Sequence, residues 1–327
     1  MSNLSSSWLL SLLLASALAP AAAAHDAPGS ILVFPEFDSR IATSTILTVT
    51  NTNPDVAVRA EFVYIHGADC LETNRLELLT PNDTFTTLAS FHNPNQEEGF
   101  LYVVARSATT GAPVHFNWLI GQALTVNGVV LFDYSYNPYT YRAVNAGGPG
   151  TSTNVDGDSL RDLNGIEYEA SPDQLLVPRF LGQGPAPLIE SELVLINLTG
   201  GKLFDAVVDF LVYNDNEEVF SAQYKFRCWE RESLLDISGV FSNAFLHDGT
   251  SDDPEEIGGA PSLESGWMRI DGQAAFSSAA SFANPAILAV LNERVALVFG
   301  SADLPYGAGA NVNGDLLGVN VLGDSSP

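Results

Sequence analysis

The feature that most constrains the fold of this chain is an internal repeat of strand-like segments that recur in the same order. The segment 31–37 (ILVFPEF) returns as 175–180 (LLVPRF), and 45–51 (TILTVTN) returns as 192–197 (ELVLIN). Three later pairs follow: 57–64 with 205–212, 99–104 with 266–270, and 154–158 (NVDGD) with 311–315 (NVNGD). This spacing far exceeds the 20–50 residues of solenoid or propeller repeats, so the pattern predicts the duplication of a whole domain.

The repeated segments have the pattern of β-strands. Val58, Ala60, Phe62 and Tyr64 occupy every second position of 57–64, which is the period of a strand with one buried face. Turn-forming pairs such as Asn-Gly and Gly-Gly separate the segments. Helix candidates are few, and 281–293 is the main one, although Pro285 makes a strand an equal alternative. The sequence therefore predicts an all-β protein of two tandem, duplicated antiparallel β-sandwich units, at 25–171 and 172–327.

The first 24 residues have the layout of a secretory signal peptide. An apolar run at 8–19 precedes Pro20 and four alanines, and it is too short for a membrane span, which needs about 20 apolar residues. The usual basic residues before the run are missing. We expect cleavage near Ala24 and an exported product without a membrane-inserted segment, located outside the cell, on its surface or in the periplasm.

The first unit resembles the immunoglobulin-like modules of exported bacterial proteins. The resemblance depends on residues 47–54 (LTVTNTNP), 57–64 and 79–84 (LTPNDT), where a strand leads through an Asn/Pro turn to its partner and a later Pro turn opens the next strand. The second unit departs from this pattern, because Gly200-Gly201 replaces the Asn-Pro turn. The resemblance implies a scaffold and no particular activity.

Charge limits the partners of the chain. Thirteen Lys and Arg stand against 39 Asp and Glu, which gives a formal net charge of −26. Such a field repels phosphate backbones and anionic lipid surfaces, so the composition argues against nucleic-acid and membrane partners. It is compatible with divalent cations, a basic partner, or solubility alone.

The repeated tag at 154–158 and 311–315 suggests a calcium site. Calcium prefers several oxygen ligands on a flexible loop, and the tags place oxygen-bearing side chains at alternate positions. The candidate ligands are Asn154, Asp156, Asp158, Asp162, Asn311, Asn313 and Asp315. The spacing fails the EF-hand pattern, because Ser159 stands where Gly is required and Gly165 where Glu is required. Tight Asn-Gly and Asp-Gly turns are the alternative explanation.

A tyrosine-rich run is the second candidate site. Tyr134, Tyr136, Tyr139 and Tyr141 lie close together, and the second unit has no clear counterpart. Exposed tyrosines stack on sugar rings or anchor protein partners, so this run predicts a site for an extracellular glycan or a surface protein. The alternative is that these rings belong to the core or cover a sheet edge.

Cys70 and Cys228 are the two cysteines, and they stand at different places in the two units. Export permits a disulfide between them, which would join the units. The alternating segment that ends in Cys228 allows another outcome, in which this cysteine is a small buried hydrophobic residue.

The sequence contains no recognisable catalytic motif. It has no Gly-x-Ser-x-Gly elbow, no phosphate-binding glycine loop, and no histidine pair at metal-ligand spacing. The leading prediction is therefore a non-catalytic exported protein with a structural or adhesive role. The alternatives are a glycan- or surface-polymer-binding module, assisted by calcium, and a divergent hydrolase whose catalytic groups come from distant loops.

Overall fold

The computed structural model describes residues 27–129, 132–145, 147–155, 157, 161–184, 189–214, 217–248, 264–295 and 299–314. The signal-peptide prediction for residues 1–24 and three of the predicted calcium ligands, Asp156, Asp158 and Asp315, lie outside these residues. Within the described part, no helix has the length and apolarity that a membrane crossing requires.

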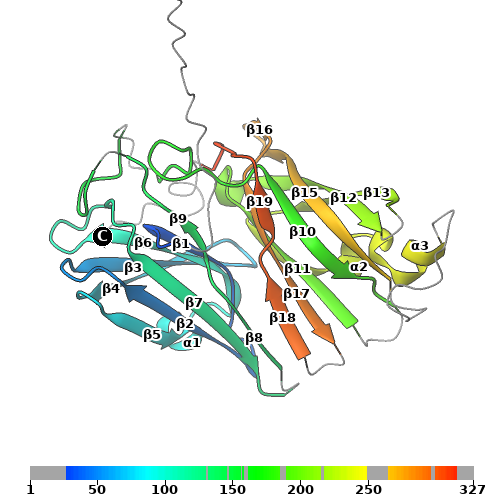
Figure 1. The fold of residues 1–327 in the computed structure, drawn as a ribbon, viewed down its shortest axis with the longest axis horizontal. Coiled ribbons are helices and arrows are strands. Elements are labelled where there is room, and N and C mark those ends of the chain that lie inside the picture. The colour runs from blue at the N-terminus through cyan, green and yellow to red at the C-terminus, as the bar shows by residue number, and fades with distance from the viewer. Residues whose placement is uncertain are drawn as a thin grey trace, which may run out of the picture.

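The first half of the chain forms two antiparallel sheets (Figure 1). The first inner sheet has the order β4 (Glu72–Leu79), β3 (Val58–His66), β6 (Glu98–Ser107), β1 (Ile31–Asp38) and β9 (Tyr139–Tyr141). The first outer sheet has the order β5 (Thr84–Leu88), β2 (Thr43–Asn51), β7 (Leu119–Asn127) and β8 (Phe132–Tyr136). A short helix, α1 (Ala89–His92), follows β5.

The second half also forms two antiparallel sheets. The second inner sheet has the order β14 (Trp229–Ser233), β11 (Ile189–Asn197), β17 (Ile287–Val295) and β18 (Phe299–Asp303). The second outer sheet has the order β13 (Val219–Phe226), β12 (Asp205–Asn214), β15 (Ser265–Phe276), β10 (Gln174–Leu181) and β19 (Tyr306–Ala308), and β16 (Ser281–Ala283) pairs with β15. Short helical segments also occur: η1 (Gly201–Leu203), α2 (Leu234–Ile237), η2 (Gly239–Phe241) and α3 (Asn243–Asp248).

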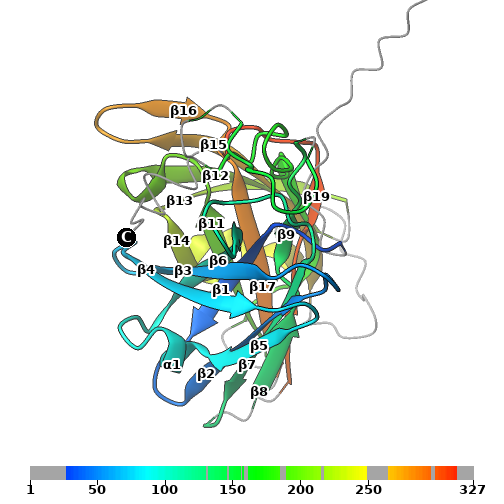
Figure 2. The ribbon, with the colours of Figure 1, turned by 90° about the vertical axis from the view of Figure 1, so that its left-hand side faces the viewer.

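The four sheets stack as four layers, with the two inner sheets in contact (Figures 1 and 2). One apolar cluster fills the space between the first outer and first inner sheets, and another fills the second sandwich. A third cluster lies between the inner sheets and takes Val63, Phe100 and Tyr102 from the first half and Val194 and Val290 from the second. The two sandwiches therefore share a buried apolar layer in addition to their own cores.

The position of each strand in the stack explains its burial pattern. In β12 of the second outer sheet, buried and half-buried residues alternate strictly, as a strand with one open face requires. In β3 the predicted alternation is wrong beyond Arg59, because Val63 and Ile65 pack on the second half while Phe62 and Tyr64 pack in the first sandwich. The ambiguous segment 281–293 forms β16 and most of β17, so its strand alternative is confirmed.

The prediction of an all-β fold of antiparallel sandwiches is confirmed, and the two halves have the same topology. The strand order of the first inner sheet matches that of the second outer sheet, and the order of the first outer sheet matches that of the second inner sheet. The β1–β6 and β10–β15 pairs even share a register shift, opposite Gly99 and Gly266 respectively. This correspondence supports the duplication and the unit boundary at 171/172, which both stay predictions.

Candidate functional site

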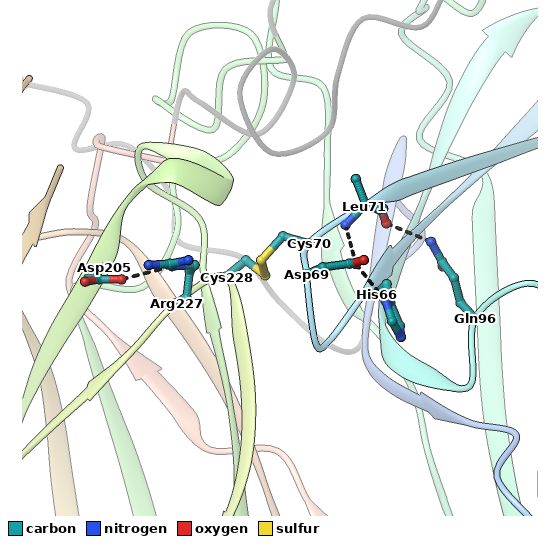
Figure 3. Close-up of a disulfide and its surroundings, with 8 residues drawn as sticks. All are labelled: His66, Asp69, Cys70, Leu71, Gln96, Asp205, Arg227 and Cys228. Carbon is teal, nitrogen blue, oxygen red and sulfur yellow. Dashed lines mark hydrogen bonds and ion pairs between the residues drawn. A yellow bond between two sulfur atoms is a disulfide. The ribbon is translucent and has the colours of Figure 1, made fainter. Parts of the chain in front are cut away.

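The junction of the two halves carries the most concentrated chemistry in the described structure. Cys70, in the loop after β3, forms a disulfide with Cys228, which immediately precedes β14, and their Cα atoms are 6.2 Å apart (Figure 3). Both cysteines are buried, so the alternatives that the sequence left open are both partly right: Cys228 points inward, and it is bridged. Asp69 fixes the Cys70 loop by accepting a hydrogen bond from the Leu71 N–H.

Trp229, next to the disulfide, packs into the first half. Its ring lies against Gly67, where a Cβ atom would be 2.4 Å from the nearest ring carbon, so a side chain at this position would displace the ring. The indole N–H donates a hydrogen bond to the carbonyl oxygen of Pro35 at 2.9 Å. Since buried Trp N–H groups need a partner, this bond fixes how β14 docks on β1.

A buried ion-pair cluster lies further along the same strands. Arg231 of β14 binds Glu36 Oε2 at 2.8 Å and Asp38 Oδ2 at 2.9 Å, both on β1. Glu36 is fully buried, and the Arg231 side chain is 10% exposed. Arg40 adds a second guanidinium to Asp38, at 2.7 Å. Arg231, Glu36 and Asp38 therefore join the halves through charges that are almost completely removed from water, whereas Arg40 is 45% exposed.

The β1 register shift, between Phe34 and Phe37, explains how a glutamate reaches this position. The extra residues of a bulge redirect side chains, and Glu36 lies inside the shift. Asn292 of β17 donates to Glu36 Oε1 at 3.0 Å, so both carboxylate oxygens have partners from the second half. A charged residue beside a proline inside an apolar run is the sequence signal that could have indicated this site.

Electrostatics favour the charged forms of Asp38 and Arg231. Burial alone would raise the pKa of Asp38, but the hydrogen bond from Arg40 and the charge of Arg231 outweigh it and hold the pKa below its usual value. Burial alone would lower the pKa of Arg231, and the charge of Glu36 and the contacts with Asp38 raise it instead. The guanidinium groups of Arg231 and Arg40 are already paired with carboxylates of the protein, so the arrangement serves to hold the two halves together.

Tyr134 and Tyr136, predicted as ligand-binding residues, complete the cluster instead of facing solvent. The Tyr134 hydroxyl donates to Glu36 Oε1, and the Tyr136 hydroxyl donates to the Glu36 carbonyl at 2.6 Å. They are 8% and 6% exposed. Burial, and then the negative charge of Glu36, raise the pKa of both hydroxyls well above their ordinary value, so they stay protonated donors.

Tyr139 and Tyr141 are fully buried in the layer between the inner sheets. The Tyr139 hydroxyl donates to the carbonyl of Ala289 at 2.9 Å, and the Tyr141 hydroxyl lies 3.2 Å from Ser171 Oγ. All four rings therefore match the core alternative, and the expectation of an exposed tyrosine face is wrong. Ligand binding by these residues stays a prediction, and none of the four rings is exposed.

A small pocket opens beside the cluster, between the halves. Its volume is about 110 Å³, and Tyr134, Asp38 and Arg231 form part of its wall. A neighbouring cavity of about 340 Å³ shares Glu192 and Arg294 with it. Burial raises the pKa of Glu192, and the opposing charges of Arg231 and Arg294 do not cancel this effect. Glu192 is therefore the lining group to test for acid–base chemistry.

The described tag residues use their side chains in turns. Asn154 Oδ1 accepts from the Gly157 N–H at 2.8 Å, and Asn311 Oδ1 accepts from the Asn313 N–H at 2.9 Å. Asn313 donates to the carbonyl of Asn284 at 2.8 Å. Asp162 is buried and accepts a long 3.5 Å hydrogen bond from the Asn164 side chain. Among the residues that the structure describes, no group of three or more His, Cys, Asp and Glu is placed to hold a metal ion. Calcium binding stays a prediction.

The open face of the second outer sheet is a further candidate site, which the sequence pattern did not indicate. Tyr213 of β12 and Trp267 of β15 stack on it, with ring centroids 4.2 Å apart and planes 2° from parallel. Arg269 pairs with Asp271 at 2.7 Å on the same face, and Tyr306 of β19 is 68% exposed. The face thus combines aromatic rings with paired polar groups.

Comparisons with known proteins identify no family. No protein-family model matches the chain, and no curated protein matches it. Among solved structures, the crystal structure of PBSX exported protein XepA aligns over 76% of this chain and 83% of that chain, with 8% sequence identity and a TM-score of 0.19. A TM-score this low supports no argument about fold or function, so the site must be interpreted from its own chemistry.

Proposed function

We propose that the chain is an exported, non-catalytic protein with a structural or adhesive role outside the cell, on its surface or in the periplasm. The apolar layer between the two inner sheets is the observation that carries this proposal. It continues from one sandwich into the other through residues such as Tyr102 and Val290, which are fully buried. A contact of this kind makes two sandwiches into one stiff body.

The remaining contacts at the junction support the same role. The Cys70–Cys228 bridge and the Arg231–Glu36 pair tie the halves at two further points. An exported protein meets no reducing pool, so the bridge would persist there. A stiff body with an open sheet face at each end suits a protein that holds a fixed distance or joins other molecules.

Turnover assays test the proposal. The purified chain would be incubated with polysaccharide, ester and peptide substrates, with a Glu192→Gln variant as the matched control because Glu192 lines both pockets. We expect no turnover by either protein. Turnover by the wild type that Glu192→Gln abolishes would assign the pocket as an active site and overturn the proposal in favour of a divergent hydrolase.

Glycan binding is a second candidate function, favoured by the open face of the second outer sheet. The stacked Tyr213–Trp267 pair and the exposed Tyr306 provide rings for sugar stacking, and Arg269 and Asp271 provide hydrogen-bonding groups beside them. A glycan array tests it with Trp267→Ala and Tyr306→Ala. Binding that both substitutions weaken would support this role, and binding that neither changes would reject this face as the site.

A further inference from the structure

In the part of the chain that the structure describes, the two ends of the molecule are open sheet faces of different kinds. Figure 1 shows the first outer sheet at the lower left and the second outer sheet at the upper right, with the inner sheets between them. One end therefore presents β5, β2, β7 and β8, and the other presents β13, β12, β15, β10 and β19.

The contact inside the molecule joins these same two kinds of face. The first inner sheet, which has the strand order of the second outer sheet, packs on the second inner sheet, which has the strand order of the first outer sheet. The interface is thus heterologous: two different faces meet, and each free end repeats the kind of face that is already buried once. A second copy could continue the stack by placing its second outer sheet on the first outer sheet of its neighbour.

Charge permits such a contact although the chain carries −26. The four strands of the first outer sheet contain one charged residue, Asp133. At the other end Arg269 pairs with Asp271 at 2.7 Å and Lys225 pairs with Asp205 at 2.7 Å, while Asp209, opposite Asp271, accepts a hydrogen bond from Gln223. End-to-end approach therefore meets less of the repulsion that the net charge imposes on other approaches.

Apolar side chains lie at matching positions on both ends. Gly99 and Gly266 are equivalent positions, because each pairs with the first residue after the register shift. Trp267, which follows Gly266, therefore corresponds to Phe100, which lies in the buried layer between the inner sheets. Asn51 and Asn197 are also equivalent, as the last residues of β2 and β11. One position before them, Ile120 and Leu288 pair with the respective strands; Ile120 is 42% exposed, whereas Leu288 is buried. Exposed apolar surface that is arranged in this way marks an interaction site.

The two end faces are more polar than the internal interface, so a contact between the end faces of two copies buries less apolar surface. Thr48 and Thr50 stand where the buried layer has Val194 and Ile196. Thr48 has nearly the shape of valine but carries a hydroxyl, which interacts with Thr86 at 3.2 Å. The faces can therefore be solvated in a monomer, and a contact between copies is weaker than the internal one.

We propose that copies of this chain stack head to tail, with the second outer sheet of one copy covering the first outer sheet of the next. The inference rests on the proposed structural role and names a second copy as the partner. Because the interface is heterologous and the end faces point in opposite directions, the assembly grows as an open filament and does not close as a dimer.

Sedimentation velocity of the mature chain over a concentration series tests the stacking. Two variants each block one face: Thr48→Glu on the first outer sheet and Leu211→Glu on the second outer sheet, where both side chains point outward. Thr109→Glu, in the exposed loop after β6, is the matched control. Circular dichroism checks folding, and Gln122→Glu or Gln223→Glu replaces a variant that melts early.

The wild type and Thr109→Glu should show weight-average mass that rises with concentration beyond a dimer. Each face variant should weaken association at least about tenfold, since the added charge is desolvated in the contact. An equimolar mixture of the two face variants should form dimers only, because each supplies the intact face that the other lacks.

Three results would overturn the stacking. A wild type that stays monomeric at all concentrations would overturn the stacking, whether or not it binds a glycan through Trp267. A Leu211→Glu variant that dimerises as strongly as the wild type would show a symmetric contact between first outer sheets. A mixture that stays monomeric would exclude the heterologous pairing. A monomeric wild type without turnover leaves the structural role standing, so the two proposals fail separately.

Discussion

Removal of the Cys70–Cys228 bridge should destabilise the whole chain without separating its halves. The bridge closes a loop with a sequence separation of 158 residues. In the chain-entropy model a loop of this length restricts the unfolded chain by about 5 kcal/mol at 25 °C, and measured losses for native disulfides are commonly about 2–5 kcal/mol. We therefore expect a loss of about 3–5 kcal/mol in the free energy of unfolding.

Urea unfolding of the wild type, of the wild type with reductant, and of a Cys70→Ala/Cys228→Ala variant measures this loss. The reduced wild type keeps both buried sulfur atoms, so its difference from the double variant separates the bridge from the packing of the two side chains. The transition should stay single, because the apolar layer between the inner sheets does not depend on the bridge.

Two outcomes would refute this reasoning. A loss below about 1 kcal/mol would show that the bridge does not constrain the unfolded chain as the loop length requires. Splitting of the curve into two transitions on reduction would show that the bridge, and not the packed layer, holds the halves together.

Three further perturbations give smaller or conditional effects. Arg231→Ala should lower the free energy of unfolding, measured in urea, by about 3–5 kcal/mol, because it leaves Glu36 buried without its cation. The control Arg227→Ala breaks an exposed pair and should lower it by under about 1 kcal/mol. Equal losses in the two variants would contradict this expectation. Glu192→Gln should raise the melting temperature at about pH 8, because a carboxyl whose pKa is raised in the folded state costs stability when it is ionised. The gain should vanish below the pKa of the unfolded state, near pH 4, and a pH series of melting curves checks this. A gain that persists at low pH would show that the effect is not electrostatic. Melting curves with and without calcium test the predicted tag site. A rise in melting temperature that Asp156→Asn removes would establish the site, and an unchanged melting temperature would favour the turns in which the described tag asparagines use their side-chain oxygens.

Local patterns in the sequence were sufficient to predict the strands. The alternation of 205–212 predicts a strand with one open face, and β12 has that pattern because the second outer sheet is open to solvent. The same argument fails for β3, where both faces are buried. A sequence of alternating residues cannot indicate that Val63 meets another sandwich, because the partner lies more than 100 residues away.

The site was harder to predict because its groups come from distant strands. Glu36 and Arg231 are separated by 195 residues, and each has local neighbours that give no indication of the other. The tyrosines illustrate the opposite error. Their alternation correctly predicts that Tyr134 and Tyr136 share a face, but only the fold shows that this face points toward Glu36 and not toward solvent. Their hydroxyls satisfy a buried carboxylate, a role that tyrosine fills as readily as ligand binding.

The apolar layer between the inner sheets makes the two halves one body. Native-state hydrogen exchange of the mature chain tests it on β6 and β17, one strand from each half, with burial on both faces. We predict that the amides of both strands exchange only through global unfolding in each redox state. The two strands then share one opening free energy in the oxidised protein and one lower opening free energy in the reduced protein. A lower opening free energy for one strand than for the other would show that a sandwich unfolds alone, and this result would contradict the account.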